Sequence, residues 1–382
     1  MTAHADGSGG RARCRALTAK GQPCRNPAGP TGLCARHERQ LREAAARAGT
    51  GPGGAAARGG AGPGGAVGVD LTAEGRGATD GGDGQATGDG QATGDGQAVA
   101  EALAPLLDRA EDALGFLRRR LTGDYPIDEF GYDPDLVKHV LAPLLRPLYR
   151  HWFRVQVRGL EHVPDTGPAL VVANHAGTLP LDSLMVALAL LDEHPAHRPL
   201  RMLAADLAFT LPVVAPLARK SGNTLACAED AERLLAAGEL VGVWPEGYKG
   251  LGKPFRDRYR LQRFGRGGFV EVALRTGTPI VPVAVIGSEE IYPMLANLRR
   301  LARLLGVPYV PVTPTFPLLG PLGLVPLPSK WLIEFCPPIE TSGYGPDAVL
   351  DPMAVFDLTD QVRDTIQQTV HKNLVTRGGV FL

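Results

Sequence analysis

"GPALVVANHAGTLPLDSLMVALALL", residues 167–191, contains the two elements that decide the fold of this chain. Its first part is a short apolar run behind Gly-Pro, which predicts a buried strand. Its last part repeats apolar residues at helical spacing, which predicts a helix. The loop between them carries His175 and Asp182. A strand that leads through a loop into a helix is the repeating unit of α/β domains, and loops at the carboxyl ends of such strands carry the chemistry.

The same alternation continues along the rest of the chain. Further apolar stretches that we expect to be strands lie at residues 151–160, 240–247, 278–287 and 330–335. Helical patterns lie beside or between them, at residues 182–193, 228–239 and 265–277. The sequence therefore predicts an α/β fold with a mixed, mostly parallel sheet flanked by helices.

Composition divides the chain into four parts. Its 382 residues are enough for a sizeable core, and the net charge of +0 points to no class of partner. A glycine-rich stretch that ends in "GDGQATGDGQATGDGQA" buries too little apolar surface to offset its ordering entropy. The predicted parts are a small Cys/His-rich basic module at residues 1–40, a disordered linker at 41–98, a helical extension at 99–150 and the main domain at 151–382.

The basic N-terminal module contains a candidate metal site. Its Cys14, Cys24, Cys34 and His37 supply three thiolates and an imidazole, which is the number of ligands that tetrahedral zinc takes. The cluster resembles small Cys-Cys-Cys-His motifs of bacterial proteins, which implies a structural zinc. The alternative is a disordered basic tail with idle thiols. No aromatic residue is interleaved for base stacking, so a nucleic-acid partner is not favoured.

His175 and Asp182 form a candidate acid–base pair. A helix that starts near Asp182 brings its carboxylate close to the His175 ring. A carboxylate that holds one ring nitrogen leaves the other free to act as a general base. The alternative is that Asp182 only caps the helix and that His175 is an ordinary loop residue.

A second strand-end loop, "VGVWPEGYKG" at residues 241–250, places a Pro-Glu-Gly turn after an apolar strand. With the Asn-His and its following Asp, it resembles the glycerolipid acyltransferases, the superfamily of glycerol-3-phosphate and lysophosphatidic acid acyltransferases. Their third motif is Phe-Pro-Glu-Gly-Thr-Arg-Ser, and their fourth is an apolar strand around a proline, matched by "IVPVAV" at residues 280–285. "ARKSGN" around Lys220 is similar to the second motif. The resemblance covers about residues 150–340.

Two features depart from the family pattern. The family separates its His from its Asp by four residues, whereas six separate His175 from Asp182, and Pro180 stands where the Asp is expected. A longer spacing with a proline resembles the diacylglycerol-acyltransferase-like branch. In the third motif Trp244 replaces Phe and "YKG" replaces "TRS", which puts Lys249 in place of the family's arginine as a point charge instead of a bidentate fork.

The resemblance implies acyl transfer without a cofactor. His175 would take the proton of an acceptor hydroxyl, and Asp182 would orient and stabilise the imidazolium. The hydroxyl would attack the thioester of acyl-CoA or of acyl-carrier protein, while backbone N–H groups near Gly177 would hold the oxyanion. The sequence has no Gly-x-Ser-x-Gly elbow, no P-loop and no convincing dinucleotide fingerprint, which excludes the usual serine-hydrolase, nucleotide and dinucleotide patterns.

A basic run follows the Pro-Glu-Gly loop. Residues 249–266 hold seven Lys or Arg and one acid, which suits a phosphoglycerol, the diphosphate of coenzyme A or an anionic membrane. The alternative is a solvated face with ordinary ion pairs. Glu246 is read either as a ligand to a substrate hydroxyl, which the resemblance favours, or as a cap of its own turn. The expected substrate-binding residues are Glu246, Gly247, Lys249, Lys253, Arg256 and Lys220.

The charge-free run at residues 304–328 is long enough to cross a bilayer, but it contains seven prolines. It is expected either to lie at the membrane interface or to wrap the domain as a buried loop. The expected partners are an acyl donor, a glycerolipid acceptor and a membrane, with the protein in the cytoplasm on the inner membrane face. A non-catalytic protein that binds lipid or nucleic acid through the same scaffold is the second hypothesis.

Overall fold

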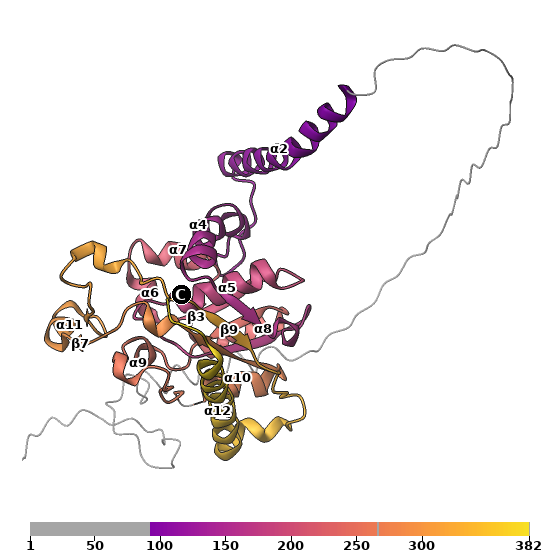
Figure 1. The fold of residues 1–382 in the computed structure, drawn as a ribbon. Helices are drawn as coiled ribbons and strands as arrows, with labels where there is room; N and C mark the ends of the chain where they lie inside the picture. The colour runs from indigo at the N-terminus through magenta and orange to yellow at the C-terminus, as the bar shows by residue number, and fades with distance from the viewer. Residues whose placement is uncertain (1–91, 266, 382) are drawn as a thin grey trace, which may run out of the picture. The chain divides into compact units, whose positions relative to one another are not determined.

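The computed structural model describes residues 92–265 and 267–381 (Figure 1). The expected zinc ligands, Cys14, Cys24, Cys34 and His37, lie outside the described residues, as does the expected linker up to residue 91. The first described helix, α2 (Ala92–Thr122), takes in the end of that expected linker. Two ion pairs of 2.6 Å, Arg119–Asp135 and Arg120–Asp133, join α2 to the segment that follows it.

A seven-stranded sheet lies at the centre of the domain, in the order β1-β9-β6-β2-β5-β3-β4. Neighbouring strands are parallel except for β6 and β9, which pair antiparallel. The prediction of a mixed, mostly parallel sheet flanked by helices is therefore confirmed. The strands are β1 (Gln156–Arg158), β2 (Ala169–Ala173), β3 (Leu200–Ala204), β4 (Thr224–Leu225), β5 (Leu240–Val243), β6 (Ile280–Ile286) and β9 (Leu332–Phe335).

Helices cover both faces of this sheet, and each face has its own apolar core. Val171 of β2 packs with the helices of one face, whereas Leu170 and Val172 pack with those of the other. A strand that is covered on both sides has no polar face, which explains the unbroken apolar run of β2. The first face carries α4 (Ala142–Pro147) and α5 (Leu181–Glu193), and the second carries α8 (Ala228–Ala236), α10 (Gly268–Thr276) and α12 (Pro352–Thr376).

The sequence did not predict β3 or β4. Arg201 is the second residue of β3 and breaks its apolar pattern, yet the residue is only 1% exposed. Its guanidinium pairs with Asp128 at 2.5 Å and with Glu239 at 3.4 Å. These partners come from distant parts of the chain, so a local pattern cannot reveal that the charge is buried. β4 has two residues, too few to show any period.

The described part of the chain also contains several shorter elements. None of the helices in the described part of the chain is long and apolar enough to cross a membrane. The two short strands β7 and β8 pair with each other, separately from the central sheet. These elements are α3 (Pro134–Leu136), α6 (Asp206–Thr210), α7 (Val214–Lys220), α9 (Tyr248–Leu251), β7 (Ala296–Asn297), α11 (Arg299–Leu305) and β8 (Pro311–Val312).

Candidate active site

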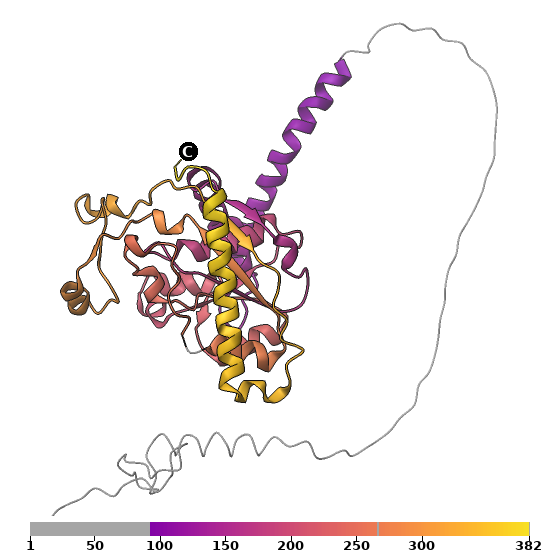
Figure 2. The same cartoon turned by 60° about the horizontal axis from the view of Figure 1, so that its bottom comes forward.

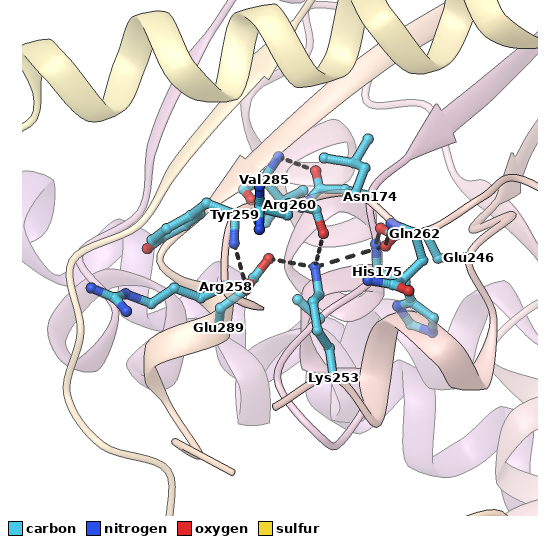
Figure 3. Close-up of polar contacts among 12 residues, drawn as sticks. Asn174, His175, Glu246, Lys253, Arg258, Tyr259, Arg260, Gln262, Val285 and Glu289 are labelled. Atoms are coloured by element: carbon cyan, nitrogen blue, oxygen red, sulfur yellow. Dashed lines mark hydrogen bonds and ion pairs between the residues drawn. The ribbon is translucent and has the colours of Figure 1, made fainter. Parts of the chain in front are cut away.

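The loop after β2 is fixed to the neighbouring strand β6 by Asn174. Its buried side-chain amide donates to the Val285 carbonyl at 2.9 Å and accepts from the Val285 N–H at 2.8 Å (Figure 3). The side chain therefore continues the pairing of β2 with β6 by one residue. This explains why an asparagine precedes His175: its amide can donate and accept in the plane of a strand.

His175 and Asp182 are hydrogen-bonded to each other. Nδ1 of His175 lies 2.8 Å from Oδ2 of Asp182, and the Asp182 side chain is fully buried. The same carboxylate accepts the N–H groups of Ala176 and Ser183, each at 2.8 Å. Asp182 is thus held by three hydrogen bonds, and it lies in the first turn of α5, whose N-cap residue is Pro180. A carboxylate at Nδ1 favours the proton on that nitrogen and leaves the lone pair on Nε2.

The middle of this loop is packed closely against the segment that follows β6. Gly177 has a φ of +93°, and an added Cβ would lie 2.5 Å from the Ser288 carbonyl oxygen. The next residue, Thr178, is also buried and also has a positive φ, of 64°. Among the described residues, neither of these two backbone N–H groups has a hydrogen-bond acceptor. Two neighbouring free N–H groups beside a candidate base can bind an oxyanion.

Glu246 joins the two strand-end loops. The residue is 3% exposed, and its carboxylate accepts the N–H of His175 at 2.9 Å and the N–H of Gln262 at 2.6 Å (Figure 3). Burial raises the pKa of Glu246, while the nearby Lys253 ammonium and both N–H groups oppose that shift. The sequence did not indicate that Glu246 would bind the backbone of the histidine itself.

Lys253 occupies the space between two buried carboxylates. Its ammonium donates to Glu289 and to the Arg260 carbonyl, both at 2.9 Å, and lies 3.8 Å from Glu246 (Figure 3). Burial raises the pKa of Glu289 to about 7, although the Lys253 charge lowers it. Lys253 was expected to bind substrate, but its ammonium is bound to protein groups in this structure. Its role toward substrate stays a prediction.

Only part of the expected binding set lies around His175. Gly247 starts α9 beside Glu246, and its φ of 53° with ψ of −141° is a glycine conformation. Lys249 is exposed on α9, and Arg256 is 85% exposed beside Asp257. Lys220 is half-buried at the end of α7. No described contact joins Lys249, Arg256 or Lys220 to His175, so their binding roles also stay predictions.

An apolar groove was not predicted from the sequence. It has a volume of about 190 Å³ and lies between the segment of α3 and α4, helix α5, strand β3 and helix α7. Leu184 of α5, two residues after Asp182, is part of its wall. The helical extension did contain a sequence signal for the groove, because several of its apolar side chains line it. The lining includes Leu141, Leu145, Leu184, Leu188, Met202 and Leu217.

Trp244 replaces the family's phenylalanine at the end of β5. Its ring centroid lies 6.0 Å from that of His175. The residue is 8% exposed, and its indole N–H has no hydrogen-bond partner among the described residues. A buried unpaired donor is unfavourable in the free protein, so this N–H is available to a bound molecule.

Comparisons with known proteins show what this chain is similar to. A family model described as Acyltransferase matches residues 154–286. An uncharacterized protein of Mycobacterium tuberculosis is 63% identical over 267 residues, which is 70% of this chain and 75% of that protein. The 1-acyl-sn-glycerol-3-phosphate acyltransferase alpha of Mus musculus is 28% identical over 254 residues, 65% of this chain and 74% of its own. The crystal structure of the 1-acyl-sn-glycerophosphate acyltransferase PlsC from Thermotoga maritima has a TM-score of 0.41 and 20% identity, covering 63% of this chain and 82% of that chain.

Proposed function

This chain belongs to the glycerolipid acyltransferase superfamily, and from this we propose that it transfers a fatty acyl group to a hydroxyl of a glycerol-based lipid or phospholipid. The proposed donor is acyl-CoA or acyl-carrier protein. The observation that carries the proposal is the 2.8 Å hydrogen bond between His175 and the buried carboxylate of Asp182. A protein that only bound lipid or nucleic acid would have no need of a base oriented in this way.

In the proposed reaction, Nε2 of His175 takes the proton of the acceptor hydroxyl. The hydroxyl oxygen forms a bond to the thioester carbon, and the negative charge moves to the former carbonyl oxygen. The free N–H groups of Gly177 and Thr178 are our candidates to bind that oxyanion. When the C–S bond breaks, the imidazolium returns the proton to the leaving thiolate. Asp182 stabilises the imidazolium while it exists.

We propose that the apolar groove along α5 holds the acyl chain. Leu184, two residues after Asp182 in α5, is part of its wall, and most of its lining is aliphatic. Each methylene that moves from water into such a groove contributes about 0.8 kcal/mol, so a long chain gains much of its affinity there. The exposed Lys249 and Arg256 and the half-buried Lys220 remain our candidates to bind phosphate groups of the substrates. Glu246 and Lys253 would have to exchange their present bonds to contact substrate directly.

We further propose that the protein acts at the inner face of the membrane, where both substrates meet. The reaction as proposed uses no cofactor, and a structural zinc at Cys14, Cys24, Cys34 and His37 stays a prediction.

The test is product identification. Purified full-length protein is incubated with labelled acyl-CoA or acyl-carrier protein and a panel of glycerol phosphate, lysophosphatidate and neutral glycerides. We expect one ester product from wild type and from His151→Ala, which alters an exposed histidine outside the site. The His175→Ala variant should give none above background. Transfer to no acceptor in the panel by well-folded wild type would refute the proposed function.

A further inference from the structure

The chain between β6 and β9 leaves the body of the domain. Residues 295–325 include the paired strands β7 and β8, the helix α11 between them, and a turn after β8. In both views this segment extends away from the central sheet (Figures 1 and 2). We call residues 295–325 the leucine lobe.

Large apolar side chains on the leucine lobe are exposed. Leu304 of α11 is 82% exposed, and Leu318 and Leu322 of the following turn are 84% and 70% exposed. Leu295, Leu305 and Leu319 are each more than half exposed as well. A monomeric soluble protein rarely leaves so many large apolar side chains of one short segment in water, so the lobe is suited to a partner.

The charge of the lobe has a single sign. Arg299, Arg300 and Arg303 of α11 are exposed, and none of them forms an ion pair within residues 92–265 and 267–381. The sequence contains no Asp or Glu between Ile291 and Ile333. Exposed leucines beside unpaired arginines complement a partner that has an apolar interior under an anionic surface. A bilayer that contains anionic phospholipid has this chemistry.

The base of the lobe contacts the candidate active site. The Tyr309 hydroxyl donates to the backbone carbonyl of Thr178, in the loop between His175 and Asp182. The Met294 carbonyl accepts the N–H of Phe255 at 2.9 Å, just before the lobe begins. Met294 also lines a small cavity together with Gly177 and Thr178. A bilayer bound to the lobe would therefore lie close to the loop that carries the proposed base.

We propose that the leucine lobe docks this protein onto an anionic lipid bilayer. The leucines of α11 and of the turn enter the acyl-chain region, while the three arginines bind lipid phosphates. This proposal names the surface that would hold the protein at the membrane, and it rests on the proposed function, which requires access to lipid substrates. Docking is nevertheless measurable without any acyl donor, so the two ideas fail separately.

The experiment is co-sedimentation of the full-length protein with vesicles. One set contains phosphatidylcholine alone, and the other contains phosphatidylcholine with phosphatidylglycerol. We expect Leu318→Asp/Leu322→Asp to bind both sets at least about tenfold more weakly, because two inserted side chains become charged. The Arg299→Gln/Arg300→Gln/Arg303→Gln variant should lose the preference for phosphatidylglycerol and the salt dependence of binding.

Leu350→Asp is the matched control, because Leu350 is 78% exposed but lies outside the lobe. It should bind vesicles as wild type does. Phe316 is avoided because it packs against Gly323 inside the turn. The thermal midpoint of every variant shows whether it folds, and transfer of a short soluble acyl group reports on the site separately. Wild-type vesicle binding by a folded Leu318→Asp/Leu322→Asp variant would overturn the proposal. If wild type is a dimer and the Leu318→Asp/Leu322→Asp variant is a monomer, the surface would instead be an interface with a second copy of this chain.

Discussion

Asp182 shows how much of a site one residue can organise. Its carboxylate binds the His175 ring and two backbone N–H groups, so it fixes both the base and the loop around it. The sequence predicted that His175 and Asp182 meet, because a helix starting near Asp182 folds back over the loop. It did not predict the hydrogen bonds to the N–H groups of Ala176 and Ser183, because every residue type except proline has a backbone N–H and the sequence does not show which of them bind a carboxylate.

Asp182→Asn should reduce turnover less than His175→Ala does. The amide keeps one oxygen to accept a hydrogen bond, but the charge that stabilises the imidazolium is lost. We expect a fall in kcat of about 10²-fold or more, with little change in KM. Steady-state kinetics of the two variants beside wild type check this order, and a larger loss in Asp182→Asn than in His175→Ala would contradict it.

Glu289 should make stability depend on pH. Burial raises the pKa of its carboxyl from the ordinary 4.5 to about 7 in the folded protein. The folded state therefore holds this proton more tightly than the unfolded state does. The resulting stabilisation is complete below about pH 4.5 and is lost as the pH rises through about 7.

Glu289→Gln removes that titration. As the pH rises from 5 to 8, the thermal midpoint of wild type should therefore fall by about a few degrees relative to that of Glu289→Gln. Melting curves at unit steps of pH measure it. Glu334→Gln alters a less buried carboxylate near α12 and serves as the control. Midpoints of wild type and Glu289→Gln that stay parallel across this range would show that Glu289 does not titrate there.

At the scale of elements, α9 is pressed against the histidine loop. Gly250 of α9 has no room for a side chain, because an added Cβ would lie 2.3 Å from the His175 carbonyl oxygen and 2.8 Å from Cβ of Glu246. Gly250→Ala must therefore displace either α9 or the loop. The sequence could not show this approach, because it depends on how two separate strand-end loops meet.

We expect Gly250→Ala to lower kcat by about tenfold or more, since small displacements of a positioned base reduce turnover strongly. Gly268→Ala is the matched control, because an added Cβ at Gly268 meets nothing within 4 Å. It should retain wild-type activity and equal or higher stability. Equal kinetics in the two variants would mean that the close contact has no part in positioning His175.

The apolar groove belongs to the same scale, because several helices and strand β3 form it. Ala187 of α5 is part of its wall. Ala187→Phe should fill the groove and reduce kcat/KM for long acyl donors, while short donors that need little apolar contact are transferred as before. A series of acyl-CoA chain lengths compares the two. A uniform loss at every length would argue that the acyl chain lies elsewhere.

For the whole molecule, the sequence predicted the layers and the strands β1, β2, β5, β6 and β9 of the central sheet, and it missed the neighbouring strands β3 and β4. β2, β5 and β6 are continuous apolar runs, which are typical of strands covered on both faces, and Glu334 is the one charged residue in β9. β3 was missed because Arg201 is buried by distant acids. The basic run was read as one surface, yet Lys253 lies inside between Glu246 and Glu289. Whether a charged residue is buried or exposed depends here on acids that are distant in the sequence, and a local sequence pattern does not contain that information.

The N-terminal residues 1–91 should be dispensable for acyl transfer, because every contact that we assign to the site lies after them. Deleting them is expected to leave kcat and KM unchanged. The full-length protein should contain about one zinc per chain, and Cys14→Ser or Cys34→Ser should lose it. Metal analysis of wild type that finds no zinc would remove the expected site, and loss of turnover on deletion would show that this part contributes to catalysis.

The most direct test of the account is the turnover of His175→Ala with the acyl donor and acceptor that wild type uses best. The account predicts a fall in kcat of at least about 10²-fold at an unchanged thermal midpoint, because a general base is removed from a loop and not from the core. His151→Ala, measured in parallel, should match wild type. A folded His175→Ala protein with wild-type kcat would show that His175 is not the base.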